Sequence, residues 1–303
     1  RGNIMRALVT GGAGFIGTNL IKRLLKDGHL VVSVDNYSTG KRENEQDGCK
    51  YYEIDLSDKI SIESLESIRI VSQIPKFDII FHLAAKARIV PSIQNPKKSL
   101  FNNIDSTINI LEYARLNKIP VIYAGSSSAH GDIYANPYTF TKWNGEELCK
   151  LYTNVYDIPT VTCRFYNVYG EGQLTEGAYC TVLGIFERLY KQGRALTVTG
   201  DGLQRRDFTY VGDIVDGLIR CGENINDVSG EIVELGNGKN YSILDLVDAF
   251  GETDEIEYIA ARPGEVRESL NTDTKARDIL GWKPKGDIIE YISKNYRRKN
   301  ETN

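Results

Sequence analysis

Hydrophobic residues in the first half of the chain alternate between short continuous runs and longer periodic stretches. The run RALVT at residues 6–10 predicts a buried strand. The segment FIGTNLIKRLLKDG at 15–28 has the helical spacing of apolar residues and ends at a glycine. Further strands are predicted in LVVSVD, FDIIFHLAA, IPVIYAGSS and IPTVTCRFYN, with helical segments between several of them. Apolar strands separated by helices are typical of parallel strands buried on both faces. We therefore expect an α/β fold with a doubly wound parallel sheet.

This regular alternation ends near Asn167. Glycine-rich loops, a helix near 179–192 and short strands follow it without a clean strand–helix repeat. We therefore expect a first domain at 5–166 and a smaller α/β cap that makes up most of 167–303. The stretch 211–236 contains VGDIVDGLIRCGE and GEIVELG, which could return to the main sheet.

A glycine motif lies between the first predicted strand and helix. In ALVTGGAGFIG, Gly11, Gly14 and Gly17 allow a tight turn, close approach of the backbone to a diphosphate, and packing of helix on strand. The free N–H groups at the start of the helix suit the phosphates. Asp35 ends the second strand, where a carboxylate can accept both ribose hydroxyls and would repel a 2′-phosphate. Together these features predict a Rossmann-type dinucleotide-binding domain that favours NAD over NADP.

Several motifs occur in a fixed order: TGGAGFIG, VDNYSTGKREN, DL at 55–56, HLAA at 82–85, PYTFTK and RFYNVYG. This ordered set resembles the extended short-chain dehydrogenase/reductase family. The likeness is strongest to its NAD-dependent nucleotide-sugar epimerase/dehydratase branch, and there to the 4-epimerases of UDP-glucose and UDP-N-acetylglucosamine. The resemblance implies that NAD is bound by Gly11, Gly14, Phe15, Ile16, Gly17, Asp35, Asn36, Asp55, Leu56, Leu83, Ala84, Ala85, Lys86, Asn103, Tyr138 and Lys142.

Tyr138 and Lys142 match the YxxxK pair of that family. Residues four apart share one face of a helix, so the ammonium can lie near the phenol. A tyrosine that acts as a base near pH 7 needs its pKa lowered by about three, which corresponds to about 4 kcal/mol. We expect Lys142 and the positive nicotinamide ring of NAD+ to favour the phenolate. Ser126 follows a predicted strand and is the best candidate to bridge the sugar hydroxyl and Tyr138.

Two features depart from the family pattern. The loop between the serines and the tyrosine is short, with only GDIYAN between His130 and Pro137. His130 also stands where a tyrosine is usual, and we interpret it as a wall or core residue rather than an acid–base group.

The C-terminal half contains GDGLQRRDFTYVGDI and ARPGEVRESLNTD, which by resemblance hold a nucleoside diphosphate. Arginine suits the diphosphate oxygens because its guanidinium binds them bidentately. A small Ser269 would leave room for an N-acetyl group on the sugar. The expected substrate-binding residues are Ser127, Ser128, Asn167, Arg206, Arg262, Glu265 and Ser269.

Other enzymes of this branch need additional catalytic residues that this chain lacks, and this narrows the expected reaction. Related 4,6-dehydratases carry an Asp–Glu pair after the catalytic Ser or Thr, and the uronate decarboxylases usually carry a glutamate there, whereas this chain has Ser127 and Ser128. The GDP-sugar epimerase/reductases need a cysteine and a histidine that are missing here. The remaining set suits 4-epimerisation of a UDP-hexose through a transient 4-keto sugar. A UDP-glucuronate 4-epimerase, another enzyme of the branch and a non-catalytic NAD-binding sensor are the alternatives.

Composition limits the other classes of function. A formal net charge of −4 without a basic stripe argues against a nucleic-acid partner, and no apolar run approaches the ~20 residues that span a membrane. The five cysteines are dispersed and indicate free thiols in the cytoplasm, and the three histidines are too scattered for a metal site. Apolar stripes near 97–117 and 138–157 predict a helix-mediated homodimer.

Overall fold

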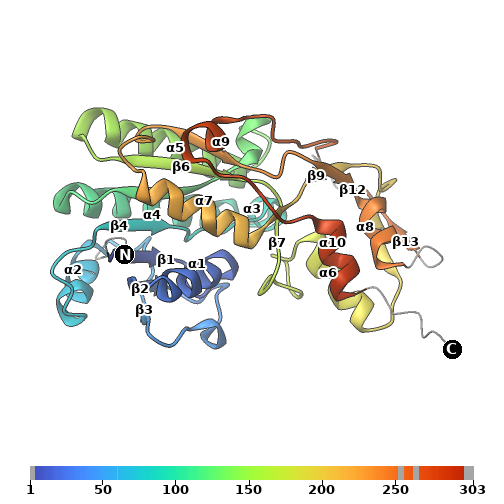
Figure 1. Cartoon of the computed structure of the whole chain (residues 1–303), viewed down its shortest axis with the longest axis horizontal. Helices are drawn as coiled ribbons and strands as arrows, with labels where there is room; N and C mark the ends of the chain where they lie inside the picture. Colours follow the sequence, from blue (N-terminus) through green and yellow to red (C-terminus); the bar gives the residue numbers. More distant parts are fainter. Residues whose placement is uncertain (1–3, 60, 252–255, 262–265, 297–303) are drawn as a thin grey trace.

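The computed structural model describes residues 4–59, 61–251, 256–261 and 266–296 of the 303-residue chain. In these residues seven strands form one parallel sheet in the order β11-β6-β5-β4-β1-β2-β3. The predicted doubly wound α/β fold is thereby confirmed (Figure 1). The strands are β1 (Arg6–Thr10), β2 (Leu30–Asp35), β3 (Lys50–Glu53), β4 (Ile79–His82), β5 (Val121–Ser126), β6 (Thr160–Phe165) and β11 (Ile232–Leu235).

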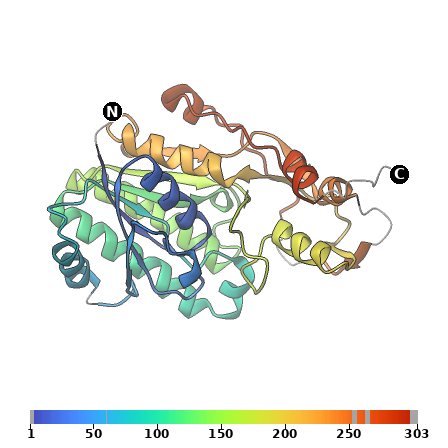
Figure 2. The ribbon, with the colours of Figure 1, turned by 60° about the horizontal axis from the view of Figure 1, so that its bottom comes forward.

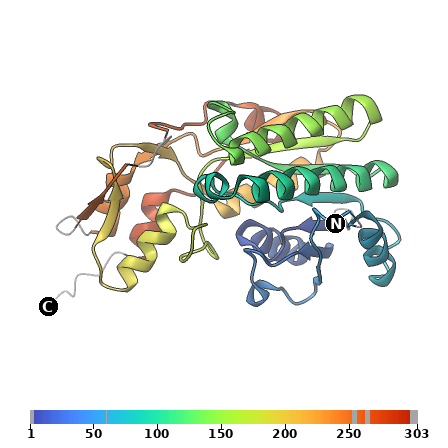
Figure 3. The same cartoon turned by 180° about the vertical axis from the view of Figure 1, so that it is seen from behind.

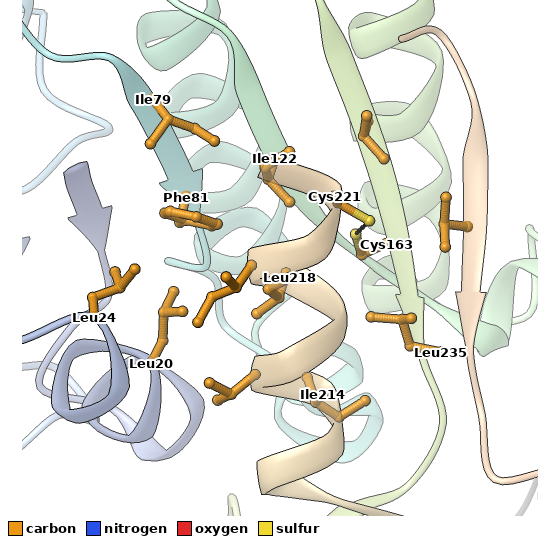
Figure 4. Packing of buried hydrophobic residues seen from close by; sticks show 14 of the residues in the cluster. Leu20, Leu24, Ile79, Phe81, Ile122, Cys163, Ile214, Leu218, Cys221 and Leu235 are labelled. Carbon is orange, nitrogen blue, oxygen red and sulfur yellow. Dashed lines mark hydrogen bonds between the residues drawn. The ribbon is translucent and has the colours of Figure 1, made fainter. Parts of the chain in front are cut away.

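Helices cover both faces of this sheet, which is why its central strands are almost wholly apolar. On one face lie α1 (Phe15–Lys26), α7 (Val211–Glu223) and the short α9 (Lys275–Leu280), and Figure 4 shows Leu20, Leu218 and Phe81 meeting in their shared core. The opposite face is covered by α2 (Ser61–Val71), α4 (Pro96–Asn117) and α5 (Pro137–Tyr156), of which α4 and α5 run side by side (Figure 3).

The direction of winding reverses between β1 and β4. From β1 the chain adds β2 and β3 on one side, and from β4 it adds β5, β6 and finally β11 on the other. Such a reversal leaves a crevice at the carboxyl ends of the two central strands, where ligands of open α/β sheets bind. The short helices α3 (Ile89–Gln94), η1 (Arg42–Asn44) and η2 (Ser127–His130) lie in loops that follow strands.

The C-terminal half forms a smaller cap beyond those carboxyl ends (Figure 2). Its core contains Phe186, Leu246, Phe250 and Ile292. Three two-stranded sheets pair β8 with β13, β9 with β12, and β7 with β10 in the described part of the chain. The cap elements are β7 (Val168–Tyr169), α6 (Val182–Lys191), β8 (Leu196–Thr199), β9 (Arg205–Asp207), β10 (Thr209–Tyr210), β12 (Asn240–Ser242), α8 (Ile243–Phe250), β13 (Ile256–Ile259) and α10 (Ile288–Asn295).

The chain crosses between the two parts more than once. Residues 211–236 contain α7, which packs on the main sheet, and β11, which pairs with β6 at its edge. The cap is therefore tied to the sheet by several segments, and the space between them is bounded by both. Among the described helices, none combines the length and hydrophobicity that a membrane crossing requires.

Candidate active site

A cavity of ≈ 1220 Å³ runs from the glycine turn after β1, past the carboxyl end of β5, to the loops of the cap. Most of the residues singled out from the sequence line it. On the cofactor side these are Gly11, Gly14, Phe15, Ile16, Gly17, Asp35, Asn36, Asp55, Leu56, Leu83, Ala84 and Ala85. At the centre and on the substrate side they are Ser126, Ser127, Ser128, Tyr138, Lys142, Asn167, Arg206 and Ser269.

The glycine turn brings two backbone segments closer than any side chain would permit. A Cβ on Gly17 would lie 2.2 Å from the carbonyl oxygen of Gly11, and Gly11 itself has a left-handed φ of +70°. Gly14 is the N-cap of α1 and has no side chain that could accept a hydrogen bond from the first N–H groups of the helix. The first N–H groups of α1 therefore remain available to an anion at the edge of the cavity.

Two carboxylates order the loops on the cofactor side. Asp35 is buried and accepts hydrogen bonds from the backbone N–H groups of Ala13 (3.0 Å) and Tyr37 (2.8 Å). Burial raises the pKa of Asp35, and these bonds only partly offset that effect. For Asp55, burial is outweighed by hydrogen bonds from Ser57 and from Asn36 Nδ2 (2.9 Å), so that its pKa is lowered.

Lys86 and Asn103 do not line this cavity. The ammonium of Lys86 donates to Ser38 Oγ (2.9 Å) in a separate pocket of ≈ 320 Å³. The side chain of Asn103 is buried, where its oxygen accepts from Lys86 N (2.8 Å) and its amide donates to Thr141 Oγ1 (3.0 Å). Asn103 thus joins the loop after β4 to α5, and the structure gives it a bracing position rather than one facing the cavity.

Tyr138 and Ser126 meet at the centre of the cavity. Helix α5 begins at Pro137, with Asn136 Oδ1 accepting from Thr139 N (2.9 Å), and this cap fixes Tyr138 in the first turn. Ser126 ends β5, and its hydroxyl oxygen accepts from Ser128 N (3.2 Å) and Ser128 Oγ (2.9 Å). Burial raises the pKa of Tyr138, and the hydrogen bond with Ser126 opposes that rise.

Lys142 is held differently from what its spacing suggested. Its ammonium donates to the carbonyl oxygen of Ala124 at 2.7 Å, and burial lowers the pKa of Lys142 to about 8. The positive side chain that opposes the rise in the pKa of Tyr138 is Arg88, a cavity residue that was not singled out from the sequence. Arg88 is fixed in part by a bond from its Nε to the carbonyl oxygen of Tyr179 (2.8 Å).

The substrate side is organised by Asp207, which the sequence analysis also missed. This buried carboxylate accepts from the backbone N–H groups of Asn237 (2.7 Å), Gly238 (2.9 Å) and Asn271 (3.0 Å), and so joins three segments. Asn167 Nδ2 donates to the carbonyl oxygen of Asp207 at 3.0 Å.

Of the residues expected to hold the substrate, Asn167 and Ser269 are neighbours, with Asn167 Nδ2 3.4 Å from Ser269 Oγ. Arg206 lines the same cavity. Arg262 and Glu265 lie outside the described residues.

Comparison with known proteins identifies the family. A sequence model described as the NAD dependent epimerase/dehydratase family matches residues 7–236. The chain belongs to this family. It is 33% identical to the UDP-glucose 4-epimerase of Mycolicibacterium smegmatis and 29% identical to the UDP-glucuronate 4-epimerase of Thermodesulfobacterium geofontis. The first comparison covers 96% of this chain and 97% of its relative, and the second covers 97% and 96%.

The likeness extends to solved structures. A UDP-glucose 4-epimerase from Thermotoga maritima, solved with UDP-glucose, superposes with a TM-score of 0.87 at 28% identity, over 95% of this chain and 96% of that one. Membership in this family makes the chain an NAD-dependent enzyme of the nucleotide-sugar epimerase/dehydratase class.

The described residues fit NAD. The uncapped start of α1 faces the cavity beside the crowded turn at Gly11 and Gly17, where an added methyl group would collide with backbone. This arrangement suits a dinucleotide diphosphate. A carboxylate at Asp35, on the rim of the same cavity, suits a ribose that bears two free hydroxyls.

An ionic network with buried carboxylates borders the cavity and was also missed. The guanidinium of Arg164 on β6 binds Glu146 on α5 (2.6 Å) and Glu234 on β11 (3.1 Å). Glu234 in turn binds His130 Nε2 at 2.8 Å. Charged residues far apart in the sequence gave no signal of this contact, because only the parallel arrangement of β5, β6 and β11 brings them together.

Proposed function

We propose that this enzyme catalyses 4-epimerisation of a UDP-hexose through a transient 4-keto sugar. UDP-glucose and UDP-galactose are the expected pair, and the N-acetylated pair is expected as well. The observation that carries the proposal is that Tyr138 and Ser126, whose side chains interact, line one cavity with the glycine turn. Ser127 and Ser128 line the wall at the positions where dehydratases of this class carry acids.

The roles of the catalytic residues follow from their contacts. NAD, when bound, supplies the group that takes up a hydride from C4 and gives it back. Tyr138 would take the proton of the 4-hydroxyl, and the hydroxyl of Ser126, which interacts with the Tyr138 phenol, would pass it on. Because burial raises the pKa of Tyr138, positive charge is needed to stabilise its ionised form, and Arg88 supplies part of it. Lys142, held at the carbonyl of Ala124, would bind the nicotinamide ribose.

The sugar must turn over between the two half-reactions while the nucleotide stays in place. Arg206 is proposed to hold the diphosphate on the cap side, with Arg262 from outside the described residues, and Asn167 is proposed to bind a phosphate or the sugar. Glu265, also outside the described residues, is proposed to accept the hydroxyls of the nucleotide ribose. Ser269 lies beside Asn167, with its hydroxyl 3.4 Å from Asn167 Nδ2. Because the Ser269 side chain is small, we propose that it leaves room for an N-acetyl group on the sugar.

The proposal is tested by incubating the enzyme with a panel of UDP- and GDP-sugars and identifying products by NMR. We expect the 4-epimer of UDP-glucose to form without net oxidation or reduction. Formation of a 4-keto-6-deoxy sugar would assign the enzyme to the dehydratases instead, and no product from any sugar would contradict the proposal. The alternative substrate, a UDP-hexuronate, is suggested by the relative from Thermodesulfobacterium geofontis.

We also propose that the enzyme is a cytoplasmic homodimer. Large apolar side chains are exposed on the face formed by α4 and α5, which Figure 3 shows side by side: Phe101, Leu116, Leu151, Val155 and Tyr156. Pairing of these two helices with their copies would cover this surface. Sizing at micromolar concentration should give twice the 34.0 kDa chain mass, and a single species at that mass would refute the dimer. The five cysteines are free thiols, as expected in a reducing compartment.

A further inference from the structure

One corner of the cavity is built from groups that accept hydrogen bonds. His130 ends η2 and Glu234 lies on β11, and both line the cavity. Their contact at 2.8 Å joins His130 Nε2 to Glu234 Oε1, with 52% of the histidine side chain exposed but only 6% of the glutamate. A half-exposed ring is therefore fixed by a buried carboxylate.

Only one of these groups is open to a ligand. Nε2 of His130 is taken by Glu234, so the nitrogen left to a ligand is Nδ1, which accepts a hydrogen bond when the proton is on Nε2. Glu234 Oε2 is buried and therefore out of reach of a ligand. Burial raises the pKa of the Tyr166 phenol, and so do the charge of Glu234 and the side-chain interaction with it.

The positive charge beside Glu234 is already shared between two carboxylates. Arg164 is the cation that binds Glu234, and it also binds Glu146, whose side chain is fully buried. A sugar hydroxyl can donate to Nδ1 of His130, whereas a hexuronate carboxylate is an acceptor only and would bring a further negative charge close to Glu234.

We propose that the His130–Glu234 pair determines substrate specificity by accepting a hydroxyl of a neutral UDP-hexose and disfavouring a UDP-hexuronate. The inference rests on the proposed epimerase function and names its substrate class. Glu234 acts directly through its charge and also positions the ring of His130.

The test compares kcat/KM for UDP-glucose and for UDP-glucuronate in the wild type and in Glu234→Gln. We expect the wild type to favour UDP-glucose at least about tenfold, which corresponds to about 1.4 kcal/mol. Glutamine has the same shape and still accepts from Arg164, but it carries no negative charge to repel a carboxylate. The variant should therefore lower the glucose-to-glucuronate ratio by about tenfold or more.

Glu231→Gln is the matched control, because it removes one negative charge from an exposed ion pair with Lys275 just before β11. The glucose-to-glucuronate ratio of kcat/KM in this control should equal that of the wild type. His130→Phe, which removes the ring acceptors, should raise KM for UDP-glucose with a smaller change in kcat.

The outcomes separate the two proposals. Equal kcat/KM for both sugars in the wild type, or a ratio that Glu234→Gln leaves unchanged, would overturn the inference and leave the epimerase function intact. A wild type that epimerises neither sugar would remove the function on which the inference rests. If Glu234→Gln does not fold, the wild-type preference alone still decides, since a preference below tenfold contradicts the proposal.

Discussion

Replacing Lys142 by methionine should abolish turnover. It should also change the stability of the protein in a way that depends on pH: relative to wild type, the variant should be more stable at neutral pH than at alkaline pH. Burial lowers the pKa of Lys142 from 10.5 to about 8. This difference corresponds to about 3 kcal/mol, at about 1.4 kcal/mol for each pH unit, by which the folded state disfavours the ammonium. Against this gain, methionine leaves the carbonyl of Ala124 without its donor, at a cost of about 1–3 kcal/mol.

The dependence on pH separates the two effects. Because the folded-state pKa lies below the unfolded-state value, the wild type carries the full penalty below pH 8. That penalty disappears as the pH rises through 10.5. The lost bond to Ala124 contributes at every pH. The stability of Lys142→Met relative to wild type should therefore fall by about 2 kcal/mol between pH 7 and pH 9.5.

Urea unfolding followed by circular dichroism at the two pH values provides the measurement, with nucleotide content checked beforehand. Lys150→Met is the matched control, since Lys150 lies on the same helix in a half-exposed pair with Glu147. Its effect should stay within about 1 kcal/mol at both pH values. A relative stability of Lys142→Met that does not change with pH would refute the reasoning.

Three further substitutions test other parts of the site. Ser126→Ala removes the bond to Tyr138 and should lower kcat by about 10- to 100-fold with little change in KM; an unchanged kcat in steady-state assays would exclude the bridging role. Gly17→Ala would place a methyl group 2.2 Å from the carbonyl oxygen of Gly11 and should eliminate NAD binding in a fluorescence titration, whereas a wild-type Kd would show that the turn can open. Arg164→Met leaves two buried carboxylates without their cation, so the free energy of unfolding in urea should fall by about 3–5 kcal/mol. Adding Glu146→Gln should restore part of this loss. A loss below about 1 kcal/mol would contradict the role of Arg164 in balancing the two charges.

The fold and the reactive centre could be predicted because their signals are local. The apolar runs of β1, β2, β4, β5 and β6, and the three glycines at the start of α1, each lie within a few residues of one another. Tyr138 is recognisable from its spacing to Lys142, and Ser126 from its place at the end of a strand. In these cases backbone geometry and one short motif determine where the side chain lies.

The surroundings of those residues could not be predicted, because they depend on contacts between distant segments. Arg164 meets Glu146 across 18 residues and Glu234 across 70, and only the strand order brings them together. Asn103 was expected to bind the cofactor, whereas in the structure its side-chain amide joins Lys86 and Thr141. Lys142 was expected to favour the ionised phenol of Tyr138, which depends on where the lysine side chain points. In the structure its ammonium points to the carbonyl oxygen of Ala124.

The central claim is that C4 of a UDP-hexose is oxidised and then reduced again in one closed site, with Tyr138 as the base. UDP-glucose deuterated at C4 tests this most directly when NMR follows its conversion by wild type and by Tyr138→Phe. We predict slower turnover than with the unlabelled sugar, UDP-galactose that keeps its deuterium at C4, and no conversion by the variant. Replacement of the deuterium by solvent hydrogen, or unimpaired conversion by Tyr138→Phe, would contradict the account.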